Sequence, residues 1–294
     1  MHDEGSVATT LNAYSPAASN AAQLGFLERG HQARFAEACS ALKLRQVSEP
    51  NTGYGTRSFG AKVIDQNGTV CWLKVFGLAS HRNERWLSEM EADSIKQVPK
   101  PQLVRQFTWT HDAEFWVARL TTLVTGLVEE GPWAGASAHG IEDPWLESLT
   151  DSLRTLAHQP CTRAHVQTRL FARWLKRYVR VPPTITPADW VTSHNDLQWS
   201  NLSYPNLTIL DWEWFGQSPL GYDQGMLIAY SCHDDELTER LEQAFKPALE
   251  SGIGAYGKLF AAHTVRNSIR SGWLTPAMEA PLGRLISRWD SEPR

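Results

Sequence analysis

The sequence predicts an α+β fold in two lobes: an N-terminal lobe with an antiparallel sheet and one helix, and a larger, mostly helical C-terminal lobe. A chain of 294 residues exceeds the usual size of a single domain. Strand patterns dominate between residues 48 and 122, and helical patterns dominate after Gly126. We therefore expect an N-terminal arm with a peripheral helix (1–47), a sheet lobe (48–122) and a helical lobe (123–294).

Local patterns predict each element of the sheet lobe. A peripheral helix is expected at Gln32–Leu44. Two runs rich in Val, Ile, Trp and Phe flank Asn67-Gly68, a pair that favours a tight hairpin turn because both residues can adopt positive φ. Helical spacing follows at Glu84–Val98 and ends at two prolines. Strands are then expected at Gln102–Thr110 and Glu114–Leu120, which completes a small antiparallel sheet with one helix against it.

The second lobe is predicted from long amphipathic segments with short apolar runs between them. The helices are expected at Pro144–His158, Ala164–Val179, Asp235–Ser251, Tyr256–Gly272 and Met278–Trp289. Two strand-like runs, Trp190–Ser193 and Leu207–Leu210, each lead into a cluster of polar residues. The cleft between the lobes is the expected ligand site.

Composition excludes several classes of protein. The net charge of -4 provides no basic face for nucleic acid. The four cysteines form no C-x-x-C pair, so neither a zinc cluster nor a disulfide framework is indicated. No segment approaches the ~18 apolar residues of a membrane helix, and the N-terminus lacks the features of a secretory signal. We expect a cytoplasmic protein with reduced thiols, monomeric or homodimeric, without a nucleic-acid or membrane partner.

The stretch 191–225 carries the most informative polar residues. The first short apolar run delivers His194, Asn195 and Asp196 into a loop, and Asn201 follows five positions after Asp196. The second run ends at Asp211. Two strands side by side would bring Asp196, Asn201 and Asp211 to one rim, and such hard oxygen ligands suit Mg²⁺ together with phosphate and water.

A lysine in an apolar strand complements this set. Phosphoryl transfer needs a metal to neutralise charge, a lysine on the phosphates and a carboxylate that aligns the attacking hydroxyl. Lys74 lies in the strand WLKVF, where a cation is unusual unless it faces a negative partner. Glu91 on the following helix is the predicted partner. A strand lysine is also common at a sheet edge, with its tip in water.

Taken together, H-x-D-L-x-x-x-N followed by I-L-D-W-E resembles the catalytic and metal loops of the aminoglycoside phosphotransferase and choline kinase superfamily. The resemblance covers roughly residues 48–235 and implies the two-lobed protein-kinase-like fold. It implies that Asp196 is the catalytic base, and that Asn201 and Asp211 hold magnesium ions. It also implies that Lys74 binds the nucleotide with Glu91, or else Glu89, as its partner.

Further segments extend the resemblance. FWVARLTTLVTG resembles the last strand and hinge of the small lobe, which places Thr122–Val124 against the adenine of ATP, with GTP left open. NTGYGTRSFG offers glycines and Ser58 near a β-phosphate, although a simple hairpin turn explains these residues equally well.

Several neighbouring residues have structural interpretations. His194 is expected to tie the catalytic loop to the metal loop, and Asp223 to act as a helix N-cap. Glu213 either binds a second metal or braces the loop.

The function that follows is an ATP- and Mg²⁺-dependent phosphotransferase acting on a hydroxyl of a small molecule, an antibiotic or related natural product by likeness to the aminoglycoside branch. A choline or ethanolamine kinase, or a sugar or amino-acid kinase, would share the fold, and tryptophans could cage a quaternary ammonium. A pseudokinase would bind nucleotide without turnover. A metal-dependent hydrolase using His194, Asp196, Asp211 and His233 would leave Lys74 unexplained.

Overall fold

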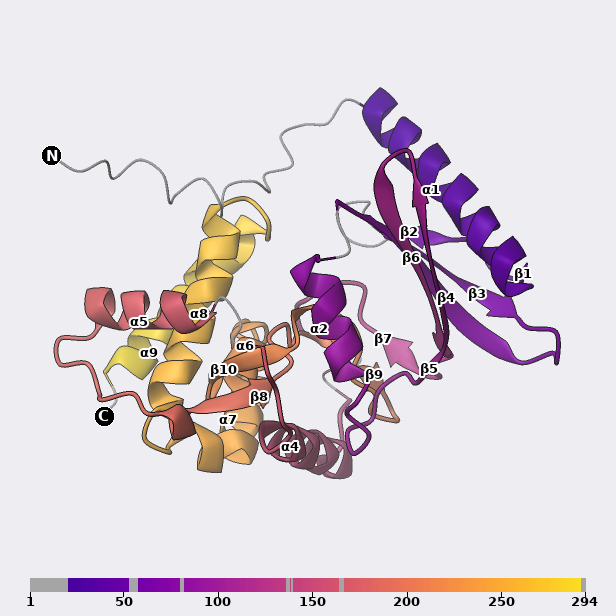
Figure 1. Cartoon of the computed structure of the whole chain (residues 1–294). Coiled ribbons are helices and arrows are strands. Elements are labelled where there is room, and N and C mark those ends of the chain that lie inside the picture. Colours follow the sequence, from indigo (N-terminus) through magenta and orange to yellow (C-terminus); the bar gives the residue numbers. More distant parts are fainter. Residues whose placement is uncertain are drawn as a thin grey trace, which may run out of the picture.

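The computed structural model describes residues 21–52, 58–79, 82–135, 138, 140–163 and 167–291. Two lobes are visible, a sheet lobe and a larger helical lobe (Figure 1). This is the α+β arrangement that the sequence predicts. Residues 1–20 of the expected arm lie outside the described residues.

The small lobe is a six-stranded antiparallel sheet in the order β1-β3-β4-β6-β5, with β2 also paired to β3. Its strands are β1 (Arg45–Gln46), β2 (Asn51–Thr52), β3 (Ser58–Ile64), β4 (Val70–Leu78), β5 (Leu103–His111) and β6 (Glu114–Thr122). The hairpin between β3 and β4 turns at Gly68, which has φ 82°, as the Asn67-Gly68 pair predicts.

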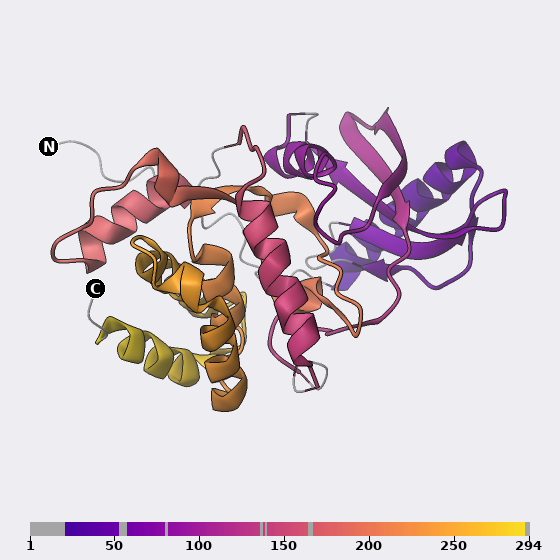
Figure 2. The same cartoon turned by 90° about the horizontal axis from the view of Figure 1, so that it is seen from below.

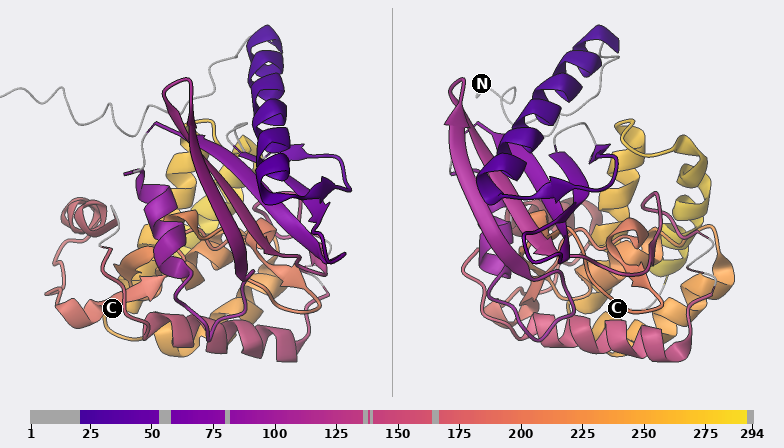
Figure 3. Two further views of the ribbon diagram at one scale, coloured as in Figure 1. Left: turned by 45° about the vertical axis from the view of Figure 1, so that its right-hand side comes forward. Right: turned by 90° about the vertical axis from the view of Figure 1, so that its right-hand side faces the viewer.

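Two helices cover opposite faces of this sheet (Figures 1 and 3). On the outer face, α1 (Ala21–Leu42) joins the alternate buried residues of the strands in one apolar core; this core contains Phe35, Ala38, Phe59, Leu73, Val75, Ala118 and Leu120. On the inner face, α2 (Glu84–Ala92) is shorter than the predicted Glu84–Val98. It begins at Asn83, whose side chain accepts a bond from the N–H of Arg85.

The larger lobe surrounds a second apolar core of helices. These are α4 (Asp143–Ala157), α5 (Gln167–Tyr178), α6 (Tyr222–Ala229), α7 (Asp235–Leu249), α8 (Gly254–Arg270) and α9 (Glu279–Asp290). Five of them lie within three residues of the predicted bounds, and α6 corresponds to the helix that was expected to begin at Asp223. α4 runs along the underside of the lobe (Figure 2). Ala92, Ile95 and Val98 also belong to this core, so the end of α2 packs with the larger lobe.

Short strands near the lobe junction complete the fold: β7 (Leu127–Val128), β8 (Trp190–Ser193), β9 (Ser203–Tyr204) and β10 (Gly216–Pro219). β8 has the predicted bounds but pairs with β10, and β7 pairs with β9. The predicted strand Leu207–Leu210 is wrong: this segment makes only an isolated bridge from Ile209 to Leu202. No helix in the described part of the chain has the length and apolarity to cross a membrane.

Candidate active site

The loop that carries Asp196 leaves β8 and is held by backbone hydrogen bonds. β8 pairs with β10 through Ser193 and Gly216. Asn195 has φ 67°, a left-handed conformation that asparagine tolerates. Its Nδ2 donates to the carbonyl oxygens of Trp214 at 3.1 Å and Gly216 at 3.2 Å. The loop is therefore fastened to the segment that follows Asp211.

Asp223 fixes the same loop from α6. Its carboxylate, 4% exposed, accepts the N–H of His194 at 2.7 Å and that of Asn195 at 2.8 Å. Burial raises the pKa of Asp223, although His194 and these two N–H groups act to lower it. The interpretation of Asp223 as a helix N-cap is wrong, because Gly221 occupies that position and the carboxylate faces the catalytic loop instead.

His194 joins the loop of Asp196 to the loop of Asp211, as expected. It is fully buried, with Nε2 2.7 Å from the carbonyl oxygen of Leu210 and the ring 4.9 Å from that of Trp212. Burial lowers the pKa of His194, which favours the neutral ring. A neutral ring that donates from Nε2 can accept the N–H of Asp196 at Nδ1, 3.3 Å away. The geometry therefore assigns His194 a structural role.

Asp196, Asn201 and Asp211 converge, although not through paired strands. Asn201 donates from Nδ2 to the backbone oxygen of Asp196 at 2.8 Å and to its Oδ2 at 3.3 Å. The N–H of Leu210 donates to the backbone oxygen of Asn201 at 2.8 Å, which brings the next residue, Asp211, alongside. Asp211 itself is left-handed at φ 57°. Two adjoining loops thus replace the predicted rim.

The neighbouring charged groups shift the pKa values of the carboxylates at this centre. Burial raises the pKa of Asp196 well above its ordinary value, and the negative charges of Asp211 and Glu213 add to this effect. For Asp211, burial acts in the same direction, but Lys74 outweighs it and the pKa is lowered. Lys74 therefore favours the anionic form of Asp211, whereas the carboxylate of Asp196 is a stronger proton acceptor than that of a free aspartate.

Lys74 connects the sheet lobe to this centre. Its Nζ lies 2.9 Å from Oδ1 of Asp211 and 3.1 Å from Oε1 of Glu89. Burial alone would lower the pKa of Lys74, but Asp211, Glu89 and Glu213 hold it well above its ordinary value. The sequence-based choice of Glu91 as partner is wrong. Glu91 accepts bonds from the N–H and Oγ1 of Thr162 at 2.7 and 3.0 Å, so it faces the larger lobe.

Two arginines near α2 were not predicted. Arg85 places Nη1 3.3 Å from Oε1 of Glu213 and stacks over the ring of Trp214 at 4.3 Å. Arg119 in β6 contacts Glu89 and Asp93. A cation between the apolar residues Ala118 and Leu120 is the same signal that identifies Lys74, and it could have identified Arg119.

The residues predicted to contact the nucleotide differ in whether their backbone groups already make hydrogen bonds within the protein. The N–H of Thr122 already donates to the carbonyl of Gln102 at 2.9 Å, whereas within the described residues the backbone of Val124 makes no bond. Ser58 is the first residue of β3, opposite Phe76. Gly53 and Gly55 lie outside the described residues. A Cβ on Gly60 would collide with the ring of Trp72, so close packing explains this glycine.

The donor set fits a divalent metal that also binds phosphate. Within the described residues, no three His, Cys, Asp or Glu side chains form a metal cluster. Asn201 bonds through Nδ2 and Asp211 through Oδ1, and no described residue bonds to Asn201 Oδ1 or Asp211 Oδ2. Hard oxygens of this kind suit Mg²⁺, which keeps several waters and takes few protein ligands.

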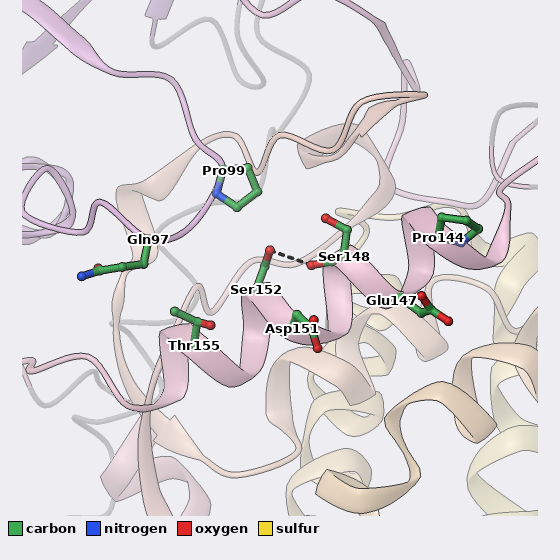
Figure 4. A pocket seen from close by; sticks show the side chains of 8 residues that line it. All are labelled: Gln97, Pro99, Pro144, Glu147, Ser148, Asp151, Ser152 and Thr155. Carbon is green, nitrogen blue, oxygen red and sulfur yellow. Dashed lines mark hydrogen bonds between the residues drawn. The ribbon is translucent and has the colours of Figure 1, made fainter.

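Two hollows elsewhere on the larger lobe contain none of these residues. One, of ≈ 470 Å³, lies between the segment 97–99 and α4, where Ser148, Asp151 and Ser152 line it (Figure 4). The other, of ≈ 660 Å³, lies between α4 and α7. Neither holds a convergent set of catalytic groups, so the charged centre at the lobe junction is the candidate active site.

The two lobes with this centre between them form a fold that the chain shares with solved phosphotransferases. Amicoumacin kinase hAmiN is similar at 12% identity and TM-score 0.58, over 87% of this chain and 91% of that one. Aminoglycoside phosphotransferase APH(4)-Ia, as a thermostable mutant, is similar at 11% and 0.55 (85% and 94%). Macrolide 2'-phosphotransferase MphH from Brachybacterium faecium is similar at 14% and 0.50 (88% and 98%). No family profile and no curated protein sequence matches the chain.

Proposed function

We propose that the protein transfers the γ-phosphate of ATP to a hydroxyl group of a small molecule, an antibiotic or a related natural product. The observation that carries this proposal is the ammonium of Lys74, bonded to both Glu89 and Asp211 beside Asp196 and Asn201. The neighbours support the acceptor class: hAmiN was solved with AMP-PNP, Ca²⁺ and Ami, and APH(4)-Ia with AMP-PNP and hygromycin B.

Each residue has a role in this proposal. Lys74 binds the phosphates, and its pairing with Glu89 keeps it at the cleft. Val124, with Thr122 before it, contacts the base through backbone groups, so GTP is an alternative donor. Ser58 is a further candidate near the phosphates. Asp211 and Asn201 would hold Mg²⁺, which when bound neutralises charge on the phosphates.

Asp196 orients the acceptor. Its carboxylate accepts a hydrogen bond from the substrate hydroxyl and holds that oxygen in line with the γ-phosphorus. As the new O–P bond forms and the bond to ADP breaks, the hydroxyl proton passes to Asp196. The raised pKa of Asp196 makes this late proton transfer easier than for a free aspartate.

The test is a panel assay of ADP release with aminoglycosides, other antibiotics, choline and sugars, in the presence of Mg-ATP. Acceptor-dependent ADP release by the wild type, lost in Asp196→Ala, is the expected result. Nucleotide binding without turnover on any acceptor would identify a pseudokinase instead. Turnover with choline alone would move the protein to the choline kinase branch.

A further inference from the structure

The inner face of the sheet carries two cations side by side. In the β4–β6 pair, Lys74 lies directly opposite Arg119, and in the β5–β6 pair Arg119 lies opposite Gln106. Alternate residues of these strands point to the other face, where Leu73 and Leu120 pack with α1. Like charges at directly opposed positions destabilise a sheet. This face therefore needs anions from another element.

Helix α2 supplies those anions from positions four apart. Glu89 divides its carboxylate between the two cations, with Oε1 3.1 Å from Lys74 Nζ and Oε2 3.3 Å from Arg119 Nε. Asp93, one turn later, accepts Nη2 of Arg119 with both oxygens, at 2.7 and 2.9 Å. The remaining Nη1 donates to Oε1 of Gln106 at 2.9 Å. The side chain of Arg119 is 7% exposed, so these contacts are shielded from water.

These hydrogen bonds, together with the ion pair between Arg119 and Glu89, form an alternating chain of charge. It runs from the Asp211 carboxylate to Lys74, then to Glu89, Arg119 and Asp93. The last residue of α2, Ala92, belongs to the core of the larger lobe, as do Ile95 and Val98 in the segment that follows. The sheet beside Lys74 therefore meets α2 through charged groups, and farther along β6 Phe115 packs against Trp86 of α2 with ring centroids 5.0 Å apart.

We propose that Arg119 is a positioning residue for the lysine of the nucleotide site, a role that rests on the phosphotransferase function proposed above. Its planar guanidinium spans Glu89 and Asp93 at once, and thereby fixes the rotation of the Glu89 carboxylate. The fixed carboxylate then sets the place of the Lys74 ammonium between Glu89 and Asp211. A lysine at position 119 keeps the charge but lacks the fork that joins both acids.

The first variant for the test is therefore Arg119→Lys, with Arg105→Lys on the exposed part of β5 as the matched control. The measurements are the dissociation constant of a fluorescent ATP analogue, the KM for ATP, the KM for the acceptor and the Tm. We expect Arg119→Lys to weaken nucleotide binding about tenfold, to raise the KM for ATP in parallel and to leave the KM for the acceptor unchanged. Arg105→Lys should match the wild type in all of them.

A double-mutant cycle with Glu89→Gln separates positioning from general destabilisation. In that background, Arg119→Lys should change nucleotide binding by less than about threefold, because the group through which Arg119 acts is already lost. The proposal would be overturned if Arg119→Lys weakened nucleotide binding by the same factor with and without Glu89→Gln. It would also be overturned if Arg119→Lys bound nucleotide with wild-type affinity. If Arg119→Lys does not fold, Asp93→Asn serves instead, and its effect on nucleotide binding must likewise vanish in the Glu89→Gln background. A wild type that binds no nucleotide overturns the phosphotransferase function itself.

Discussion

Glu89 and Glu91 lie two residues apart on α2, and the structure gives them different tasks that a pair of matched variants can separate. Glu89, 9% exposed at its side chain, accepts a hydrogen bond from Lys74 and forms an ion pair with Arg119. Glu91 accepts hydrogen bonds from the N–H and Oγ1 of Thr162 in the larger lobe. The perturbation is Glu89→Gln against Glu91→Gln, which removes one negative charge in each case and preserves size.

The expected cost follows from these contacts. A bond to a charged partner contributes about 1.5–3 kcal/mol, and each cation that Glu89 contacts keeps a second carboxylate, Asp211 for Lys74 and Asp93 for Arg119. We therefore expect a loss of about 2 kcal/mol in Glu89→Gln, which corresponds to a Tm lower by about 4 °C. If the same energy is lost from nucleotide binding, affinity falls by roughly 30-fold.

Glu91→Gln should cost no more than about 0.5 kcal/mol, because an amide oxygen can still accept from Thr162. Thermal unfolding and titration with a fluorescent nucleotide measure both quantities in the same preparations. Equal losses of nucleotide affinity in the two variants would refute the assignment of Glu89 as the partner of Lys74.

Three further outcomes are expected. Asp196→Ala should lower kcat by at least ~100-fold with nucleotide affinity retained, whereas Asp211→Ala should lose both, as steady-state kinetics and nucleotide titration will show. Asp223→Asn should cost about 1–3 kcal/mol in urea unfolding, because an amide offers one oxygen where two N–H groups now bind a carboxylate. Lys100→Met should raise Tm by about 2 °C at pH 7. Burial lowers the pKa of Lys100 despite the nearby Asp93, so the charged ammonium destabilises the folded protein at pH values below that lowered pKa. The increase in Tm of Lys100→Met over the wild type should therefore disappear as the pH rises toward the ordinary lysine pKa. An unchanged or lower Tm of the variant at pH 7 would contradict this prediction.

Much of the fold could be predicted because strong local patterns determine it. The Asn67-Gly68 turn and the amphipathic periods of α4, α7, α8 and α9 are properties of neighbouring residues. The segment 207–210 has the composition of a strand, but its backbone groups bond to Pro99, Asn201 and Ser203 instead of β8, which pairs with β10. Strand partners depend on the whole chain, which a local apolar run does not encode.

Some residues of the candidate site could likewise be predicted from local sequence, whereas others depend on distant parts of the chain. Asp196, Asn201 and Asp211 lie within sixteen residues and are joined through short loops, so their spacing in sequence predicts their convergence. The choice between Glu89 and Glu91 depends on how α2 is rotated against the sheet. Both residues are polar positions of one short helix, and the contacts that distinguish them, such as that of Glu89 with Arg119, come from residues far away in the chain.

The loop of Asp196 and the junction of α2 with the sheet differ in the kind of hydrogen-bond partner that holds them, and this difference helps to explain how the fold persists at low sequence identity. The catalytic loop is held by side chains that bind backbone atoms: Asp223 binds two N–H groups, Asn195 binds two carbonyls and His194 binds a third. Backbone partners are present whatever residues occupy the neighbouring positions, so this loop can keep its geometry while the surrounding sequence diverges. The junction of α2 with the sheet consists instead of bonds between side chains, and each of those requires both partners. We therefore expect substitutions around the catalytic loop to be tolerated more readily than any single change among Lys74, Glu89, Asp93 and Arg119.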